Sequence, residues 1–178
     1  MRCLTRLLCV SALLVSVAFA ESLSETRKKA EQGDALAQYN LGGMYFGGSD
    51  LPKDPTEAVK WFRKSAEQGN ADAQFELGLM YENGNGVPKD PTEAVKWFRK
   101  SAEQGSASAQ CNLGWVYEKG EGVPKDPVLA HVWYNIAGAN GYELAKEFLV
   151  RIEKGMSSEQ KAEATTRARE LFERLAKK

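Results

Sequence analysis

The segment PKDPTEAVKWFRKSAEQG occurs twice without change, at Pro52–Gly69 and at Pro88–Gly105. Shifting the chain by 36 residues aligns Ala30–Ser65 with Ala66–Ser101 at 26 identical positions, and Ala66–Ser101 with Ala102–Ala137 at 20. A period of this length is typical of stacked supersecondary units, each of which buries its apolar face against the next. The chain is therefore expected to be a repeat protein.

Each unit is predicted to hold two helices. The first helix begins near a residue that suits a helix N-cap, namely Asp34, Asn70 or Ser106. The second begins at Asp90 and Pro91, and Glu93 is expected to complete a capping box with Asp90. It ends at Gly105, which can adopt the left-handed conformation that follows many helices.

The apolar positions support this assignment. Ala73, Leu77 and Tyr81 recur at steps of four and share one helix face. Gly78 lies in the middle of that helix at a cost of up to about 1 kcal/mol relative to alanine, which predicts close approach of a neighbouring helix. Gly42 and Gly114 are its equivalents, and Trp61, Trp97 and Trp133 occupy one repeated position that is expected to be core.

The spacing A-x-A-x-x-x-L-G-x-x-Y, then G-x-G-V-P-K-D, then A-x-x-W resembles the Sel1-like repeat family, which is related to tetratricopeptide repeats. The resemblance covers Ala30 to about Gly141. It implies an all-α fold, a right-handed α-solenoid of antiparallel helix pairs that acts as an adaptor or scaffold, often at the bacterial envelope or in contact with a host. The first unit departs from the pattern, because GGSDLPKD replaces its G-x-G-V-P loop.

The predicted organisation has four parts: a signal peptide at residues 1–20, an N-terminal capping half-repeat at 21–33, three helix-pair units at 34–140, and a degenerate last unit with a C-terminal capping helix at 141–178. Arg2 and Arg6 precede an apolar run, and Ala18-Phe19-Ala20 offers a cleavage site. The alternative is an uncleaved anchor, but the run is about 14 residues against the ~20 that span a bilayer. The mature protein is thus expected in the periplasm or the extracellular space, with no stable membrane insertion.

Little in the sequence suggests catalysis. His131 is the only histidine, and Cys111 is the only cysteine outside the predicted signal peptide, so we expect no metal, no cofactor and no catalytic site. Both are expected to be packed, although a reactive Cys111 thiol is an alternative. Without the signal peptide, 22 basic residues face 24 acidic ones, which argues against nucleic acid as a partner. One enzyme alternative remains, since cysteine-rich relatives carry a β-lactamase assignment, but the cysteine pair of their repeats is missing here.

A second stripe on the first helices, opposite the core face, is the predicted partner-binding site. It lies on the expected concave face and comprises Tyr39, Phe46, Asp72, Phe75, Leu79, Glu82, Trp115 and Glu118. Trp115 stands out because tryptophan is enriched at binding hot spots. The alternative is that these residues fill space between units. Lys60, Arg63, Lys64 and their repeats at 96, 99 and 100 are expected to be a solvated face, with an acidic or lipid-headgroup partner as the alternative.

The predicted function is a non-catalytic, monomeric scaffold that binds a protein or peptide; a self-associating structural protein is the other alternative. The last helix is expected to cover the third unit, where Val132 and Ile136 replace the lysines of earlier units. Its own apolar residues are Ala164, Ala168, Leu171, Phe172 and Leu175. Ile136 could instead meet Phe148 and Leu149.

Overall fold

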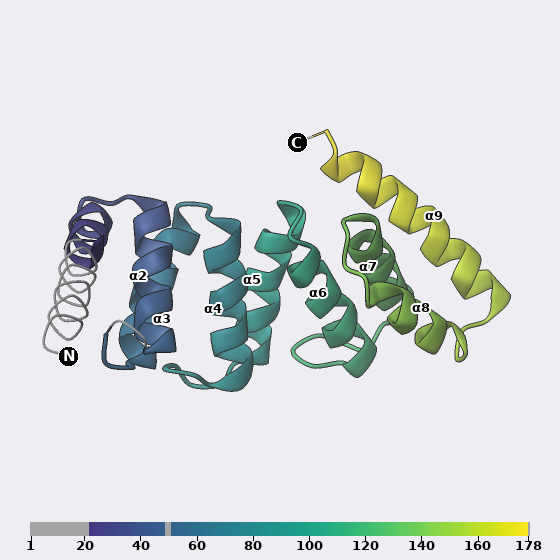
Figure 1. The fold of residues 1–178 in the computed structure, drawn as a ribbon. Coiled ribbons are helices and arrows are strands. Elements are labelled where there is room, and N and C mark those ends of the chain that lie inside the picture. The colour runs from purple at the N-terminus through teal and green to yellow at the C-terminus, as the bar shows by residue number, and fades with distance from the viewer. Residues whose placement is uncertain (1–21, 49–50, 178) are drawn as a thin grey trace, which may run out of the picture.

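The computed structural model describes residues 22–48 and 51–177, and within them all regular structure is helical. Figure 1 shows the helices as pairs standing side by side along one axis, with the last helix lying obliquely across the far end. The predicted all-α solenoid is confirmed. The predicted signal peptide lies outside the described residues.

A helix over residues 22–31 precedes three complete pairs. The first helices of the pairs are α2 (Ala35–Gly47), α4 (Ala71–Asn83) and α6 (Ala107–Lys119), and the second helices are α3 (Pro55–Glu67), α5 (Pro91–Glu103) and α7 (Pro127–Ala139). The chain ends with α8 (Ala145–Glu153) and α9 (Ser158–Leu175). Each first helix packs on the second helix of its own unit, and α3 and α5 also pack on the first helix that follows.

The helix starts are capped largely as the sequence predicts. Asn70 accepts a hydrogen bond from the Ala73 amide at 2.8 Å, and Asp90 accepts one from the Glu93 amide at 3.0 Å. The expected capping box at Glu93 is wrong. The Asp90 amide already donates to the Tyr81 carbonyl at 2.9 Å, and the Glu93 carboxylate instead accepts from Lys96 Nζ at 2.7 Å.

The mid-helix glycines make room for an aromatic ring. A Cβ atom on Gly42 would come within 2.7 Å of the Phe62 ring, and one on Gly78 within 2.6 Å of the Phe98 ring. In the third unit the ring belongs to Tyr134, 2.5 Å from the corresponding point on Gly114. The predicted close approach is therefore confirmed, and the approaching group is a side chain of the second helix.

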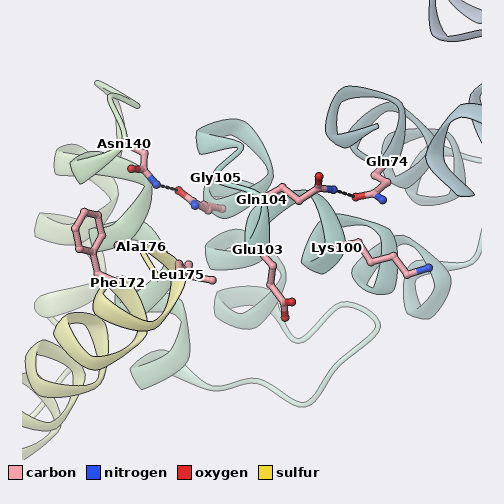
Figure 2. A pocket seen from close by; sticks show the side chains of 10 residues that line it. Gln74, Lys100, Glu103, Gln104, Gly105, Asn140, Phe172, Leu175 and Ala176 are labelled. Atoms are coloured by element: carbon pink, nitrogen blue, oxygen red, sulfur yellow. Dashed lines mark hydrogen bonds between the residues drawn. The ribbon is translucent and has the colours of Figure 1, made fainter. Parts of the chain in front are cut away.

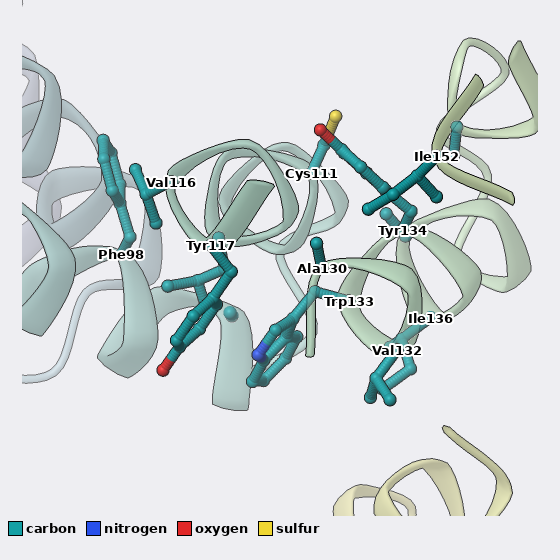
Figure 3. Close-up of a cluster of buried hydrophobic side chains, with 14 of the residues drawn as sticks. Phe98, Cys111, Val116, Tyr117, Ala130, Val132, Trp133, Tyr134, Ile136 and Ile152 are labelled. Carbon is teal, nitrogen blue, oxygen red and sulfur yellow. The ribbon is translucent and has the colours of Figure 1, made fainter. Parts of the chain in front are cut away.

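The core runs along the stack as three adjoining clusters of buried apolar residues. The three repeated tryptophans are buried as predicted, with Trp97 only 7% exposed. Figure 3 shows the cluster at the C-terminal end, where Trp133, Tyr134, Val132 and Ile136 project from α7 toward neighbouring elements.

Neighbouring units are joined by contacts that repeat every 36 residues. The buried Gln74 amide donates to the Ala66 carbonyl at 3.0 Å, and Gln110 does the same to Ala102. Gly86 has a φ of +72°, and a Cβ there would lie 2.2 Å from the Pro55 carbonyl oxygen. Each G-x-G-V-P loop thus rests on the start of the second helix one unit earlier. The departing loop of the first unit includes residues 49–50, which are outside the described residues.

The last helix covers the third unit. Val132 and Ile136 are each 1% exposed, and α7 packs on α9 through the buried Ala164 and Ala168. The expectation that Phe172 is buried there is wrong, because its side chain is 43% exposed. Its neighbours Leu171 and Leu175 are half-buried and pack against the core cluster, so Phe172 lies on the solvent side of α9.

Candidate functional site

The predicted partner-binding residues, here called the first-helix stripe, lie at the surface of α2, α4 and α6. Asp72 is exposed, and the other seven members are half-buried: Tyr39, Phe46, Phe75, Leu79, Glu82, Trp115 and Glu118. The stripe is therefore accessible along its length, but none of its apolar members is fully exposed.

The aromatic members have a structural role as well. The Tyr39 ring centroid lies 5.8 Å from that of Phe62, and the Phe75 ring centroid lies 5.9 Å from that of Phe98. Phe75, Leu79 and Trp115 also pack against the core cluster at the C-terminal end. One side of these residues fills space between units and the other meets solvent.

At its C-terminal end the stripe contacts α8 through Glu118. The Glu118 carboxylate accepts hydrogen bonds from Tyr134 Oη at 2.8 Å and from Arg151 at 2.6 Å. Burial opposes ionisation of Glu118, but these two donors outweigh it and lower its pKa. The Tyr134 pKa is raised by burial and by the bond to Glu118. Glu118 therefore holds α8 in place. Arg151 lies outside the repeated segment, so the repeat pattern alone does not place it beside Glu118.

The N-terminal part of the stripe adjoins a cavity of about 570 Å³. Ser22 and Thr26 line it from helix 22–31, Glu76 lines it from α4, and the remaining lining residues are Tyr39, Asn40, Gly43, Met44, Phe46 and Phe62. Sequence reasoning missed Glu76, because Asn40 and Asn112 occupy the equivalent positions and hide any charge pattern.

The carboxylates of α4 are not held in ion pairs by the described residues. Within the described part of the chain, no salt bridge involves Asp72, Glu76 or Glu82. Burial, and then the charge of Asp72, raises the pKa of Glu76. Burial also raises the pKa of Glu82, with a further contribution from Glu121 that Lys89 opposes.

Charge is divided between the two layers of helices. The first helices carry Asp72, Glu76, Glu82 and Glu118 against Lys119 alone, a net charge of −3. The second helices α3 and α5 each carry three basic and two acidic residues, and α7 carries no Asp, Glu, Lys or Arg, which leaves +2. The stripe thus lies on the acidic layer.

The basic residues of the second helices are occupied within their own repeats. Lys96 Nζ lies 2.7 Å from Glu93, and Lys100 Nζ lies 4.0 Å from the Trp97 ring centroid. Arg99 donates to the Tyr117 hydroxyl. Lys60, Lys64 and Arg63 repeat these three contacts one unit earlier. These contacts favour the interpretation of this surface as a solvated, internally paired face.

A second cavity of about 630 Å³ lies at the opposite edge, near the end of α9 (Figure 2). Its floor carries the hydrogen-bonded amide pairs Gln74–Gln104 and Gln110–Asn140. Phe172 and Leu175 approach from α9. No residue of the first-helix stripe lines it, and its amides already bond to one another.

The histidine and the cysteine of residues 22–48 and 51–177 are packed inside the fold. These two segments hold no group of three or more His, Cys, Asp or Glu side chains placed to bind a metal. His131 is 3% exposed, and its Nε2 lies 2.9 Å from Glu153 of α8. Cys111 is buried, and burial raises the pKa of its thiol. The described helices include none that is both long and apolar enough to span a bilayer.

Comparison with known proteins begins with a family model, described as Sel1 repeat, that matches residues 35–70, 71–106 and 107–142. A curated protein, the secretory immunoglobulin A-binding protein EsiB of Escherichia coli O6:H1, is 46% identical over 41 residues. That match covers 23% of this chain and 8% of EsiB.

Solved structures show the same fold. A protective antigen of uropathogenic Escherichia coli strains, with an SLR fold, is 38% identical and superposes with a TM-score of 0.78 over 89% of this chain and 36% of the antigen. A Sel1 repeat protein from Oxalobacter formigenes is 43% identical, with a TM-score of 0.67 over 73% of this chain and 98% of that one. Helicobacter pylori cysteine rich protein B, 23% identical with a TM-score of 0.59, shares the fold. This chain thus spans a small part of EsiB and about a third of the antigen.

Proposed function

Because the chain belongs to the Sel1 repeat family, whose helical scaffolds commonly serve protein interactions, we propose that it is a non-catalytic scaffold that binds a protein or peptide segment on the first-helix stripe. The observation that carries this proposal is the row of half-buried apolar side chains on successive first helices: Tyr39, Phe75, Leu79 and Trp115. Two of these residue types, tryptophan and tyrosine, are enriched among residues that dominate binding energy. We also propose that this surface is the concave one.

The proposed setting is the periplasm or the extracellular space. The support is the Arg-apolar-Ala-Phe-Ala pattern of residues 1–20, together with similarity to a protein that binds secretory immunoglobulin A and to a protective antigen. Mass spectrometry of the protein from its native host should find an N-terminus at Glu21. Retention of Met1 in the mature pool would contradict export by cleavage.

Binding is tested by capture from envelope extracts of the host, followed by calorimetry with the captured protein. Trp115→Ala and Leu79→Ala should each weaken binding, by about tenfold or more for a hot-spot residue, with unchanged far-ultraviolet circular dichroism. Lys60→Ala and Lys96→Ala, on the second-helix layer, are the matched controls and should bind normally. Equal binding by all four variants would overturn the assignment to the stripe.

The two alternative functions have separate readouts. Steady hydrolysis of nitrocefin by the purified protein would favour an enzyme. A molar mass in light scattering that rises with protein concentration would favour a self-associating structural role. We expect no turnover and the mass of one chain.

A further inference from the structure

We infer that the N-terminal half of the first-helix stripe binds a positively charged peptide segment through one aromatic or large aliphatic side chain of that peptide. The inference rests on the proposed function and specifies the chemistry of its partner. It assigns the site to the cavity beside Tyr39 and Phe46 and to the carboxylates of α4.

The cavity supplies the apolar part of the site. Its volume of about 570 Å³ falls in the range of pockets that enclose a ligand group, and Met44, Phe46 and the Tyr39 ring provide apolar walls. From helix 22–31 the lining residues are Ser22 and Thr26, both polar.

The charge around the cavity selects the partner. The helix that carries Tyr39 and Phe46, α2, has no charged residue, and the nearby Lys53 Nζ lies 5.8 Å from the Phe46 ring centroid. Against that one cation, α4 presents Asp72, Glu76 and Glu82 without a salt bridge, and Glu76 lines the cavity itself. Complementary potentials steer partners to a site and exclude partners of the same sign. A basic peptide can pair its positive charges with these carboxylates, whereas an acidic peptide or a nucleic acid is repelled.

The carboxylate at the cavity wall gains most from such a partner. Glu76 is half-buried, and burial together with Asp72 raises its pKa. Its charge also contributes, after burial, to the raised pKa of Tyr39. A lysine or arginine held near Glu76 would offset both the desolvation of Glu76 and its repulsion from Asp72.

The other half of the stripe lacks this property. Glu118, the counterpart of Glu82, is neutralised by Arg151, and Cys111, the counterpart of Tyr39 and Phe75, is 3% exposed. The position equivalent to Glu76 is Asn112. Around α2 and α4, the described residues therefore combine a cavity of mixed apolar and polar lining with carboxylates that form no salt bridge, whereas Arg151 of α8 neutralises Glu118 on α6.

The test is a selection of random twelve-residue peptides displayed on phage against the purified full chain, scored for the charge and composition of the enriched peptides. We expect a net positive charge and at least one aromatic or large aliphatic residue. A synthetic copy of the most enriched peptide, followed by fluorescence anisotropy, should bind Asp72→Asn/Glu76→Gln about tenfold more weakly, the effect of about 1.4 kcal/mol. Raising the salt concentration should also weaken its binding to the wild type.

The matched control is Glu57→Gln/Glu93→Gln, which makes the same change in net charge on the second-helix layer. This variant should bind the peptide as the wild type does. Phe46→Ala should weaken binding without removing a charge, and circular dichroism of each variant checks the fold.

The outcomes separate this inference from the proposed function. Enriched peptides that are neutral or acidic, or that bind the Asp72→Asn/Glu76→Gln variant normally but lose affinity for Trp115→Ala, would overturn the inference and leave the scaffold function standing. Equal weakening by the control variant would also overturn it, because the effect would then follow net charge. Failure to enrich any peptide would count against both.

Discussion

A Cβ atom on Gly42 would lie 2.7 Å from Cδ1 of Phe62, which is closer than real side-chain contacts allow. Gly43, the next residue of α2, has no atom within 4 Å of the same point. Two neighbouring glycines in one helix therefore differ completely in their reason for being small. Gly42 leaves room for the ring of Phe62 on α3, whereas Gly43 has no packing role.

These glycines give a paired prediction. Gly42→Ala should destabilise the fold by about 1–3 kcal/mol, the usual cost of overpacking, offset in part by better helix propensity. Gly43→Ala should stabilise it by up to about 1 kcal/mol, because alanine is the better helix former and meets no atom. Chemical unfolding measures both, and a stabilising Gly42→Ala would contradict the packing.

Trp97 should be a core residue whose indole nitrogen contributes little. Trp97→Ala should cost about 3–5 kcal/mol. Its Nε1 is buried without a hydrogen-bond partner among the described residues, so Trp97→Phe should cost much less. A loss below about 1 kcal/mol for Trp97→Ala in urea unfolding would contradict the core assignment.

Glu76→Gln should raise the melting temperature at neutral pH. Burial and Asp72 raise the folded-state pKa of Glu76 above its ordinary value of 4.5, so its ionised form destabilises the fold. The destabilisation by ionised Glu76 is fully present above the folded-state pKa and disappears as the pH falls toward 4.5. The increase in melting temperature of Glu76→Gln over the wild type should therefore shrink as the pH falls from neutral toward 4.5. A gain that does not change with pH would refute the electrostatic origin.

The contact between α7 and α9 can be tested with two identical substitutions. Ala168 is buried against the third unit and Ala162 is exposed on the same helix. Ala168→Glu should lower the melting temperature and promote association, because it would force Val132 and Ile136 away from their cover. Ala162→Glu should leave both unchanged. Removal of residues 156–178 should act like Ala168→Glu, and unchanged melting would show that α9 contributes no cover.

The repeat predicts most of this fold because the same local signals recur in each unit. Asn70, Asp90 and Gly105 act as the sequence indicates, and the tryptophans are buried. Glu93 shows the limit of local rules. Whether a capping box forms depends on the Asp90 amide, and that amide is taken by the Tyr81 carbonyl across the loop.

The site was less predictable, for two physical reasons. Glu118 occupies the position of the third unit that is equivalent to Glu82. Arg151, which lies 33 residues later and beyond the repeated segments, neutralises it. Glu76 breaks the repeat and therefore looks like noise in a self-comparison, although it lines the cavity beside Tyr39.

Because the G-x-G-V-P loops rest on the preceding unit, each unit depends on contacts with the unit before it. A Cβ atom on Gly86 would lie 2.2 Å from the Pro55 carbonyl oxygen and one on Gly122 2.3 Å from that of Pro91, so the second and third units contact the preceding unit in the same way. Duplication of one 36-residue block can thus lengthen the molecule without redesigning any junction. Deletion shortens it just as cleanly when the cut spans one whole period. Length is then a trait that gene duplication can adjust, while the specialised ends stay as they are.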